Sequence, residues 1–210
     1  MAKGITSQTL QRLPMYFNYL ISLPESKQNG HISATAIAEA LGLNDVQVRK
    51  DLASVSSGGR PKIGYCTAEL ISDIGQFLGF ENHDGVVVAG MGNFGKAMLE
   101  HKGFAEYGFD ILCGFDCDER IIGTEIAGRK IYHISEMSEF CHEHNVDIGI
   151  ITVPEKSAQE VCTIMTDAGI RYILNFAPIH LNVPRGVIVH NENISLTLAM
   201  LARTSGMIIE

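Results

Sequence analysis

The stretch Gly85-Val-Val-Val-Ala-Gly-Met-Gly-Asn-Phe-Gly95 decides the fold. Its β-branched residues, Val86–Val88, predict a short buried strand, and the pattern G-x-G-x-x-G follows at once over Gly90–Gly95. Strand, glycines and helix in this order are typical of a βαβ unit that binds a dinucleotide. The glycines make the tight turn, let the backbone approach a pyrophosphate and pack the helix on the strand. The first N–H groups of the helix would hold the phosphates.

An acidic residue stands where such a unit recognises ribose. Asp116 lies about 20 residues after Gly95, at the end of a strand predicted over residues 109–115. A carboxylate there accepts hydrogen bonds from the adenosine ribose and repels a 2′-phosphate, which favours NAD(H) over NADP(H). Asp118 is a second, weaker candidate for this role. The alternative is that Asp116 only ends the strand.

The sequence beyond Asp116 continues to alternate between strands and helices. We predict strands over residues 130–133, 147–153 and 172–176, and helices over residues 135–145 and 157–168. This alternation predicts an α/β fold with a Rossmann-like, doubly wound parallel sheet. Ligands of such sheets bind beyond the carboxyl ends of the strands. The candidate cofactor-binding residues are Gly90, Met91, Gly92, Asn93, Phe94, Gly95, Asp116, Asp118, Val153, Pro154, Asn175 and Phe176.

The first 80 residues have the pattern of short helices. Apolar residues at three- and four-residue steps predict a first helix, with the positions Leu10, Leu13, Phe17 and Leu20 on one face. Pro14 is expected in the first turn of that helix. Ser33 is expected to cap a second helix that ends at Gly42. Asn44 and Gln47 resemble the capping pair of a third helix.

The third helix is apolar on one side only, with the stripe Val48, Leu52 and Val55. Two short helices joined by a turn that contains glycine, the second one basic on its free side, match a helix-turn-helix. An ordinary helical hairpin is the alternative. Residues 56–62 are turn-forming and basic, and residues 63–66 are expected to return as a strand, so they predict a β-wing. The candidate DNA-binding residues are Asn44, Gln47, Arg49, Lys50, Ser54, Arg60 and Lys62.

A predicted helix over residues 68–80 completes this winged helix-turn-helix domain, and polar residues 81–84 mark its boundary. Residues 1–80 carry seven Lys and Arg against six Asp and Glu, whereas residues 81–210 carry nine against 18. The net charge of −8 therefore belongs to the second part of the chain, which is not expected to contact nucleic acid. Residues 52–68 hold no carboxylate and are the segment best suited to contact phosphate.

Composition is that of a globular protein, since 46% of the 210 residues are hydrophobic. No apolar stretch approaches the roughly 20 residues of a membrane-spanning helix. The five cysteines do not form a disulfide framework and are expected to be reduced thiols. No signal sequence begins the chain, so we expect a cytoplasmic protein, and we predict no metal site.

These motifs resemble those of the Rex family of redox-sensing transcriptional repressors, over nearly the whole chain. The N-terminal part of the resemblance rests on Thr9, Leu10, Arg12, Leu13, Pro14, Ala38–Gly42, Gln47–Leu52, Gly64 and Tyr65. The C-terminal part rests on Gly90–Gly95, Phe115, Asp116, Asp118 and Leu174–Pro178.

The resemblance implies a homodimer that binds pseudo-palindromic operator DNA when NADH is scarce and releases it when NADH accumulates. We expect a winged-helix domain over residues 1–82 and an NAD(H)-binding domain over residues 83–192. Residues 193–210 would form a C-terminal segment whose helix, about residues 194–203, is exchanged between subunits. NADH is expected to bind better than NAD⁺, because a pocket that removes the nicotinamide ring from water disfavours its cationic form.

The chain departs from the family pattern in three places. Residues Ala53–Ser57 stand where many relatives have aromatic and acidic residues, so operator preference is expected to differ. His101 stands where the resemblance implies a tyrosine linked to the cofactor response. Asn193 stands where it implies an aspartate that pairs with Arg12. We expect Arg12, His101 and Asn193 at the switch or at the subunit interface.

Two other functions share the glycine motif. The nearer is a Rossmann-type module that binds CoA or NAD without a DNA role, because the loop recognises a pyrophosphate common to both cofactors. The other is a small NAD-dependent oxidoreductase. After Phe176 only about a helix and a short strand remain, which leaves no room for a substrate domain, and no histidine has a recognisable catalytic partner. We therefore expect no enzymatic activity.

Overall fold

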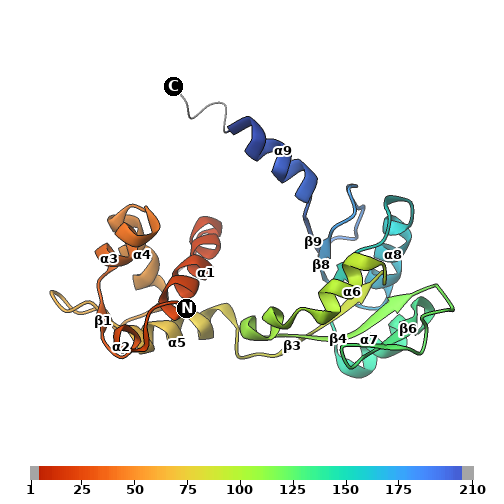
Figure 1. The fold of residues 1–210 in the computed structure, drawn as a ribbon, viewed down its shortest axis with the longest axis horizontal. Coiled ribbons are helices and arrows are strands. Elements are labelled where there is room, and N and C mark those ends of the chain that lie inside the picture. The colour runs from red at the N-terminus through yellow and green to blue at the C-terminus, as the bar shows by residue number, and fades with distance from the viewer. Residues whose placement is uncertain (1–4, 205–210) are drawn as a thin grey trace. The chain divides into compact units, whose positions relative to one another are not determined.

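The computed structural model describes residues 5–204, and these form two compact units that divide between Asn82 and His83 (Figure 1). The first unit is mainly helical. Its elements are α1 (Ser7–Ile21), α2 (Glu25–Gln28), β1 (His31–Ile32), α3 (Ala34–Leu41), α4 (Asp45–Val55), β2 (Tyr65–Cys66) and α5 (Thr67–Leu78). Buried side chains from α1, α3, α4 and α5 form its core: Leu13, Tyr16, Leu20, Ile37, Val48, Leu52, Leu70 and Ile74.

Local capping explains where the two central helices begin and end. The Ser33 hydroxyl accepts a hydrogen bond from the N–H of Ala36 at 3.0 Å, and Gly42 ends α3 in the left-handed conformation at φ 65°. Asn44 Oδ1 caps α4 by accepting from the N–H groups of its second and third residues. The expected caps Ser33, Gly42 and Asn44 are therefore confirmed. The expected pairing of Gln47 with Asn44 is wrong, because the Gln47 amide donates to Asp51 instead of closing a capping box.

The expected place of Pro14 is wrong. Thr6 caps α1 by accepting from the N–H of Thr9, so the helix begins at Ser7 and Pro14 lies in its interior. Proline has no N–H to donate to the carbonyl of Leu10 four residues earlier, which weakens the helix at that turn. Leu10 is itself 45% exposed, so the apolar face of α1 begins at Leu13.

The wing of the first unit is short. β1 pairs antiparallel with β2, with His31 opposite Cys66, and a single bridge between Arg60 and Gly64 closes the turn. Gly64 is required there, because its φ is +89° and a Cβ would fall 2.3 Å from the carbonyl oxygen of Ile32. The sequence predicted the returning strand but not its partner β1, which is too short to show a period of two.

The second unit is built around a sheet whose seven described strands follow the order β5-β6-β4-β3-β7-β8-β9. All pair in parallel except β5 with β6. The strands are β3 (Asp84–Ala89), β4 (Phe109–Asp116), β5 (Glu125–Ile126), β6 (Arg129–His133), β7 (Ile148–Ile151), β8 (Tyr172–Asn175) and β9 (Ile188–Asn191). The helices are α6 (Asn93–Glu100), α7 (Met137–His144), α8 (Glu155–Asp167) and α9 (Ile194–Thr204), with 3-10 turns at Lys102–Tyr107 and Ile134–Glu136.

Helices cover both faces of this sheet. Val87 and Ala89 of β3 pack with side chains of α7 and α8, whereas Val86 and Val88 pack with Leu99 of α6 on the other face. Strand β3 lies between β4 and β7, and the chain order reverses there. The carboxyl end of β3 is therefore the topological switch point, where ligands of such folds bind. The expected doubly wound fold is confirmed.

The last described helix, α9, follows β9 (Figure 1), and none of its residues is buried. It is the start of the predicted segment 193–210, of which residues 205–210 lie outside the described residues. Among residues 5–204, no helix combines the length and the apolar character that crossing a membrane requires. The five cysteines are free thiols, and burial raises the pKa of Cys113, Cys141 and Cys162.

Candidate functional sites

The glycine loop forms the floor of a cavity at the carboxyl end of β3. Gly90 has φ +99°, and a Cβ there would lie 2.6 Å from Val153. A Cβ on Gly95 would lie 1.8 Å from the carbonyl oxygen of Gly90, so only glycine lets α6 pack this close to the strand. Gly92 faces open space, and no side chain caps the start of α6. The first N–H groups of α6 therefore suit a pyrophosphate.

Asp116 ends the neighbouring strand and is tied to this loop. Its Oδ2 accepts from the backbone N–H of Met91 at 2.6 Å, and its Oδ1 accepts from the N–H groups of Cys117 and Asp118 at 2.7 and 2.9 Å. These three bonds orient the carboxylate at the edge of the cavity. A carboxylate offers about four acceptor positions, so capacity remains for ribose hydroxyls.

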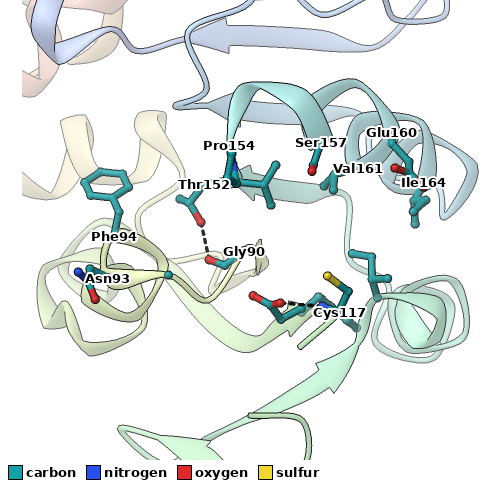
Figure 2. A pocket seen from close by; sticks show the side chains of 15 residues that line it. Gly90, Asn93, Phe94, Cys117, Thr152, Pro154, Ser157, Glu160, Val161 and Ile164 are labelled. Atoms are coloured by element: carbon teal, nitrogen blue, oxygen red, sulfur yellow. Dashed lines mark hydrogen bonds between the residues drawn. The ribbon is translucent and has the colours of Figure 1, made fainter. Parts of the chain in front are cut away.

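The cavity has a volume of about 540 Å³ and lies between the glycine loop and α8. Figure 2 shows Ser157, Val161 and Ile164 of α8 on one side and Gly90, Asn93 and Cys117 on the other. Thr152 joins the two sides, because its hydroxyl donates to the carbonyl of Gly90 at 2.7 Å. The lining residues are Gly90, Gly92, Asn93, Phe94, Phe115, Asp116, Cys117, Ile134, Thr152, Val153, Pro154, Ser157, Glu160, Val161 and Ile164.

The contribution of α8 to this cavity was not predicted from the sequence. Ser157, Glu160, Val161 and Ile164 stand at positions i, i+3, i+4 and i+7, so they share one face of the helix. This spacing was visible in the sequence. Whether this face of α8 lines a ligand site depends on which end of the helix faces the glycine loop. That follows only from the order of the strands in the sheet.

Five predicted cofactor residues do not line this cavity: Met91, Gly95, Asp118, Asn175 and Phe176. Met91 is 2% exposed and Gly95 is buried. Asn175 is fully buried, and its amide holds the following loop by donating to the carbonyls of Ala177 and Ile179 and to Asn191 Oδ1. The Asn175 side chain lines neither cavity, and the assignment of this residue to the cofactor stays a prediction.

Asp118, the weaker candidate for the ribose acceptor, already has a charged partner. It forms an ion pair with Arg120 at 2.6 Å, and this hydrogen bond lowers the pKa of Asp118 to about 2. The Arg120 guanidinium donates to both carboxylate oxygens of Asp118, and Asp118 does not line the cavity. Asp116 is thus the better candidate for the ribose acceptor.

A second cavity, of about 330 Å³, adjoins the first and shares Phe94, Thr152 and Val153 with it. Phe94 meets Phe176 edge to face, with 4.7 Å between ring centroids. The remaining lining residues are Ala177, Pro178, Glu192, Asn193, Ile194 and Ser195. With adenosine at Asp116 and pyrophosphate at the glycine loop, this mostly apolar space lies where a nicotinamide ring would extend.

The first unit presents the expected basic surface. Gln47, Arg49, Lys50 and Ser54 of α4 are exposed, whereas Val48 and Leu52 are fully buried. Arg49 and the wing residues Arg60 and Lys62 line a groove of about 490 Å³. Its other lining residues are Ser33, Ala34, Thr35, Gly59, Pro61, Gly64 and Tyr65. A groove lined by three basic side chains suits a nucleic-acid backbone.

No group of three or more His, Cys, Asp and Glu side chains in the described part of the chain is placed to hold a metal ion.

Known proteins resemble this chain in both units. A model described as "CoA binding domain" matches residues 81–179, and one described as "Putative DNA-binding protein N-terminus" matches residues 4–53. The redox-sensing transcriptional repressor Rex of Porphyromonas gingivalis is 39% identical over 197 residues, which cover 94% of this chain and 90% of the relative. The Rex of Treponema denticola is 40% identical over 193 residues, 92% of this chain and 91% of the relative. This chain belongs to the Rex family of redox-sensing transcriptional repressors.

Solved Rex-family structures agree with this assignment. The repressor RSP in complex with beta-NAD⁺ and operator DNA matches with a TM-score of 0.90 at 30% identity, over 98% of this chain and 94% of RSP. RSP in complex with beta-NADH matches with a TM-score of 0.85 at 28% identity, over 98% of this chain and 96% of RSP. The predicted order of a winged-helix unit followed by a Rossmann-like unit is that of the Rex family.

The three positions expected at the Rex switch are placed as follows. Arg12 finds an acidic partner inside its own unit, Asp51, at 2.7 Å. His101 follows α6, is exposed and meets the ring of Phe104 edge to face. Asn193 lines the second cavity, and its Oδ1 accepts from the N–H of Leu196 at the start of α9. An amide therefore serves as helix cap where the family resemblance implies an aspartate.

Proposed function

We propose that this chain is a cytoplasmic, homodimeric Rex repressor that binds operator DNA and is released from it when NADH binds. The observation that carries the proposal is that one chain holds both an exposed basic recognition surface and a glycine-loop cavity with an acidic ribose acceptor. Support comes from RSP, which is described in complex with operator DNA and NAD⁺ and in complex with NADH.

The DNA-binding half of the proposal rests on α4 and the wing. Gln47 and Lys50 are exposed on α4 and are assigned to base edges and phosphates, together with Arg49 and Ser54. Arg60 and Lys62 on the wing are assigned to the backbone or the minor groove. Asn44 contributes as the cap of α4. A two-fold homodimer would place two such helices on half-sites separated by whole turns of DNA, so the operator would be pseudo-palindromic.

The NAD(H)-binding half rests on Asp116, the glycine loop and the two adjoining cavities. The residues assigned to the cofactor are Gly90, Met91, Gly92, Asn93, Phe94, Gly95, Asp116, Val153, Pro154 and Phe176. Phe94 and Phe176 would take the nicotinamide ring out of water, which costs the cationic ring of NAD⁺ more than the neutral ring of NADH. Glu192 also lines this cavity, but its carboxylate is partly exposed and offsets only part of that cost. NADH is therefore the preferred ligand.

The switch is a coupling free energy between the two ligands. If NADH binds better to the arrangement of the dimer that cannot meet both half-sites, NADH and operator weaken each other by the same factor. Each tenfold effect needs about 1.4 kcal/mol of differential affinity. Arg12, His101 and Asn193 are assigned to this switch. No step in it requires catalytic turnover of the nicotinamide.

CoA is the competing ligand, because residues 81–179 match a family described as a CoA binding domain. Both cofactors carry a pyrophosphate for the glycine loop, but CoA also carries a phosphate on its adenosine ribose. The carboxylate of Asp116 disfavours a phosphate in that position. Titrations with NADH, NAD⁺ and CoA, followed by nicotinamide fluorescence and by calorimetry, distinguish the two. Tighter binding of CoA than of NADH would contradict the NADH assignment.

The decisive experiment is a mobility-shift assay on a library of palindromic duplexes, with and without NADH. We expect retention without NADH and release with it. Arg49→Ala is expected to weaken DNA binding by about tenfold and to leave NADH affinity unchanged, because each close phosphate or base contact contributes on the order of 1 kcal/mol. A wild-type protein that retains no duplex under any nucleotide condition would refute the repressor function and leave the NADH assignment standing.

A further inference from the structure

A buried carboxylate lies directly beneath the recognition surface. Asp51 belongs to α4, yet its side chain is only 2% exposed. It accepts hydrogen bonds from three residues of α1: Thr9 Oγ1 at 3.0 Å, Arg12 at 2.7 and 3.1 Å, and Tyr16 OH at 2.8 Å. Thr9, Arg12 and Tyr16 share one face of α1, being three and four residues apart. The carboxylate therefore fixes α4 to α1.

The fifth donor to this carboxylate comes from the recognition helix itself. Gln47 lies one turn before Asp51, and its Nε2 donates to Asp51 Oδ1 at 2.9 Å. Gln47 is otherwise exposed. The Nε2 atom of the Gln47 amide is thus held by a buried carboxylate, while the rest of the side chain remains exposed.

The chemistry of the anchor permits only one orientation of the Gln47 amide. An ionised carboxylate accepts hydrogen bonds and donates none, so it binds the NH₂ end of the amide and never the oxygen. Burial opposes the ionisation of Asp51, but the hydrogen bonds from Arg12, Tyr16, Gln47 and Thr9 lower its pKa below the usual value. Asp51 is therefore ionised, and the Gln47 oxygen and one N–H are left for a ligand.

We infer that Asp51 is a positioning residue for base recognition, which holds the Gln47 amide so that it reads an adenine in each half-site. Adenine offers an acceptor, N7, and a donor, the N6 amino group, side by side in the major groove. The amide oxygen and the remaining N–H of Gln47 match that pair. This inference rests on the proposed function, since it requires α4 to enter the major groove.

The test compares the base preference of four proteins on duplexes that differ from the selected operator at single base pairs. The proteins are the wild type, Asp51→Asn, Gln47→Ala and the double variant. An asparagine at 51 offers both an oxygen and an NH₂ group, so the Gln47 amide can bind in either orientation. We expect the wild type to prefer A·T at one position per half-site by about fivefold to a hundredfold. Asp51→Asn should reduce this preference to the level of Gln47→Ala, with no further loss in the double variant.

A matched control separates positioning from charge. Asp45→Asn removes the same charge from the same helix, but Asp45 pairs with Arg49 and does not contact Gln47. It is expected to keep the A·T preference. A purely structural effect of Asp51 would instead weaken binding to all duplexes equally and leave the base preference unchanged.

A second measurement decides the inference if Asp51→Asn does not fold. In the full-length wild-type protein, the side-chain amide protons of Gln47, assigned by their loss in Gln47→Ala, should show one proton that is shifted downfield and exchanges slowly. Rapid exchange of both protons overturns the inference. So does an A·T preference that Asp51→Asn retains, or one that Gln47→Ala retains. Failure of the wild type to bind any duplex refutes the proposed function and this inference with it.

Discussion

The carboxylate of Asp116 is assigned two roles. It holds the backbone of the glycine loop at Met91 and is proposed to accept the ribose hydroxyls of the cofactor. The two roles favour the same chemistry, because both use the carboxylate as an acceptor and both exclude a neighbouring phosphate. A variant that keeps the shape and removes the charge separates them.

Asp116→Asn is therefore expected to weaken NADH binding by about tenfold or more, since a hydrogen bond to a charged group contributes about 1.5–3 kcal/mol. It should narrow the difference in affinity between NADH and NADPH, because no carboxylate then repels the 2′-phosphate of NADPH. Fluorescence titration with both nucleotides measures the change. DNA binding without nucleotide should be unaltered, and unchanged discrimination against NADPH would contradict the role of Asp116.

Glu192 is the acidic residue that lines the second cavity, where the nicotinamide ring is assigned. It pairs with His190 at 2.9 Å and is partly exposed. A nearby carboxylate attracts the cationic ring of NAD⁺ and leaves NADH unaffected. Glu192→Gln is thus expected to weaken the binding of NAD⁺ by about twofold to fivefold, with little effect on the binding of NADH.

Competition titration of NAD⁺ against NADH measures the ratio of their affinities. Glu160→Gln is the matched control, because Glu160 lines the cavity assigned to adenosine. It should leave the ratio unchanged. Equal shifts in both variants would show that Glu192 acts only through overall charge.

Single residues of the site were predictable where their spacing along the chain carries the chemistry. Gly90, Gly92 and Asp116 were identified in this way. Asn175 was not, because its place at a strand end predicts a ligand as readily as it predicts a buried amide that holds a loop. The partnership of Arg12 with Asp51 joins residues that are 39 positions apart, and no local pattern encodes that distance.

At the scale of elements, the stability of the contact between α1 and α4 depends on pH on both sides of neutrality. The pKa of Asp51 is lowered in the folded protein, so its stabilisation is present above about pH 4 and is lost as the pH falls through the folded-state value. Burial and the hydrogen bond to Asp51 raise the pKa of Tyr16 from 10.0 to about 12. Its stabilisation is present below pH 10 and is lost as the pH rises toward 12.

Urea unfolding followed by circular dichroism between pH 3 and pH 11 measures how the free energy of unfolding depends on pH. We expect Tyr16→Phe to reduce the alkaline loss of stability by on the order of 1 kcal/mol and to keep the acidic loss. Burial also raises the pKa of Tyr65, so part of the alkaline loss should remain. Asp51→Asn should reduce the pH dependence of the free energy of unfolding on the acidic side. An alkaline loss of unchanged size in Tyr16→Phe would assign all of it to other groups.

The boundaries of the elements were predicted best where capping residues are local. Ser33, Gly42 and Asn44 were recognised because each acts on residues within one helical turn. Pro14 was misplaced, because burial of Leu13 and Tyr16 stabilises a helix that continues through a proline. Tertiary packing overrode local propensity there, as it did for the two-residue strand β1.

At the scale of the whole molecule, α9 is the element that is incomplete within one chain. Its apolar side chains are 55–63% exposed: Ile194, Leu196, Leu198, Met200 and Leu201. They lie on more than one side of the helix, and a helix that is apolar on most sides is stable in water only when it is buried. A second copy of this chain is the proposed cover, since the repressor is proposed to act as a two-fold dimer.

Leu198→Glu is therefore expected to shift the protein from dimer to monomer in sedimentation velocity, because burying an unpaired carboxylate in an apolar interface costs several kcal/mol. Ser138→Glu adds the same charge at an exposed position of α7 and should leave the dimer intact. A monomer presents one recognition helix instead of two, so its operator affinity should fall by at least about a hundredfold, as expected when two linked contacts are separated. A Leu198→Glu protein that stays dimeric would place the dimer contact elsewhere. One that becomes monomeric but binds the palindrome as tightly as the wild type would refute the two-fold reading of the operator.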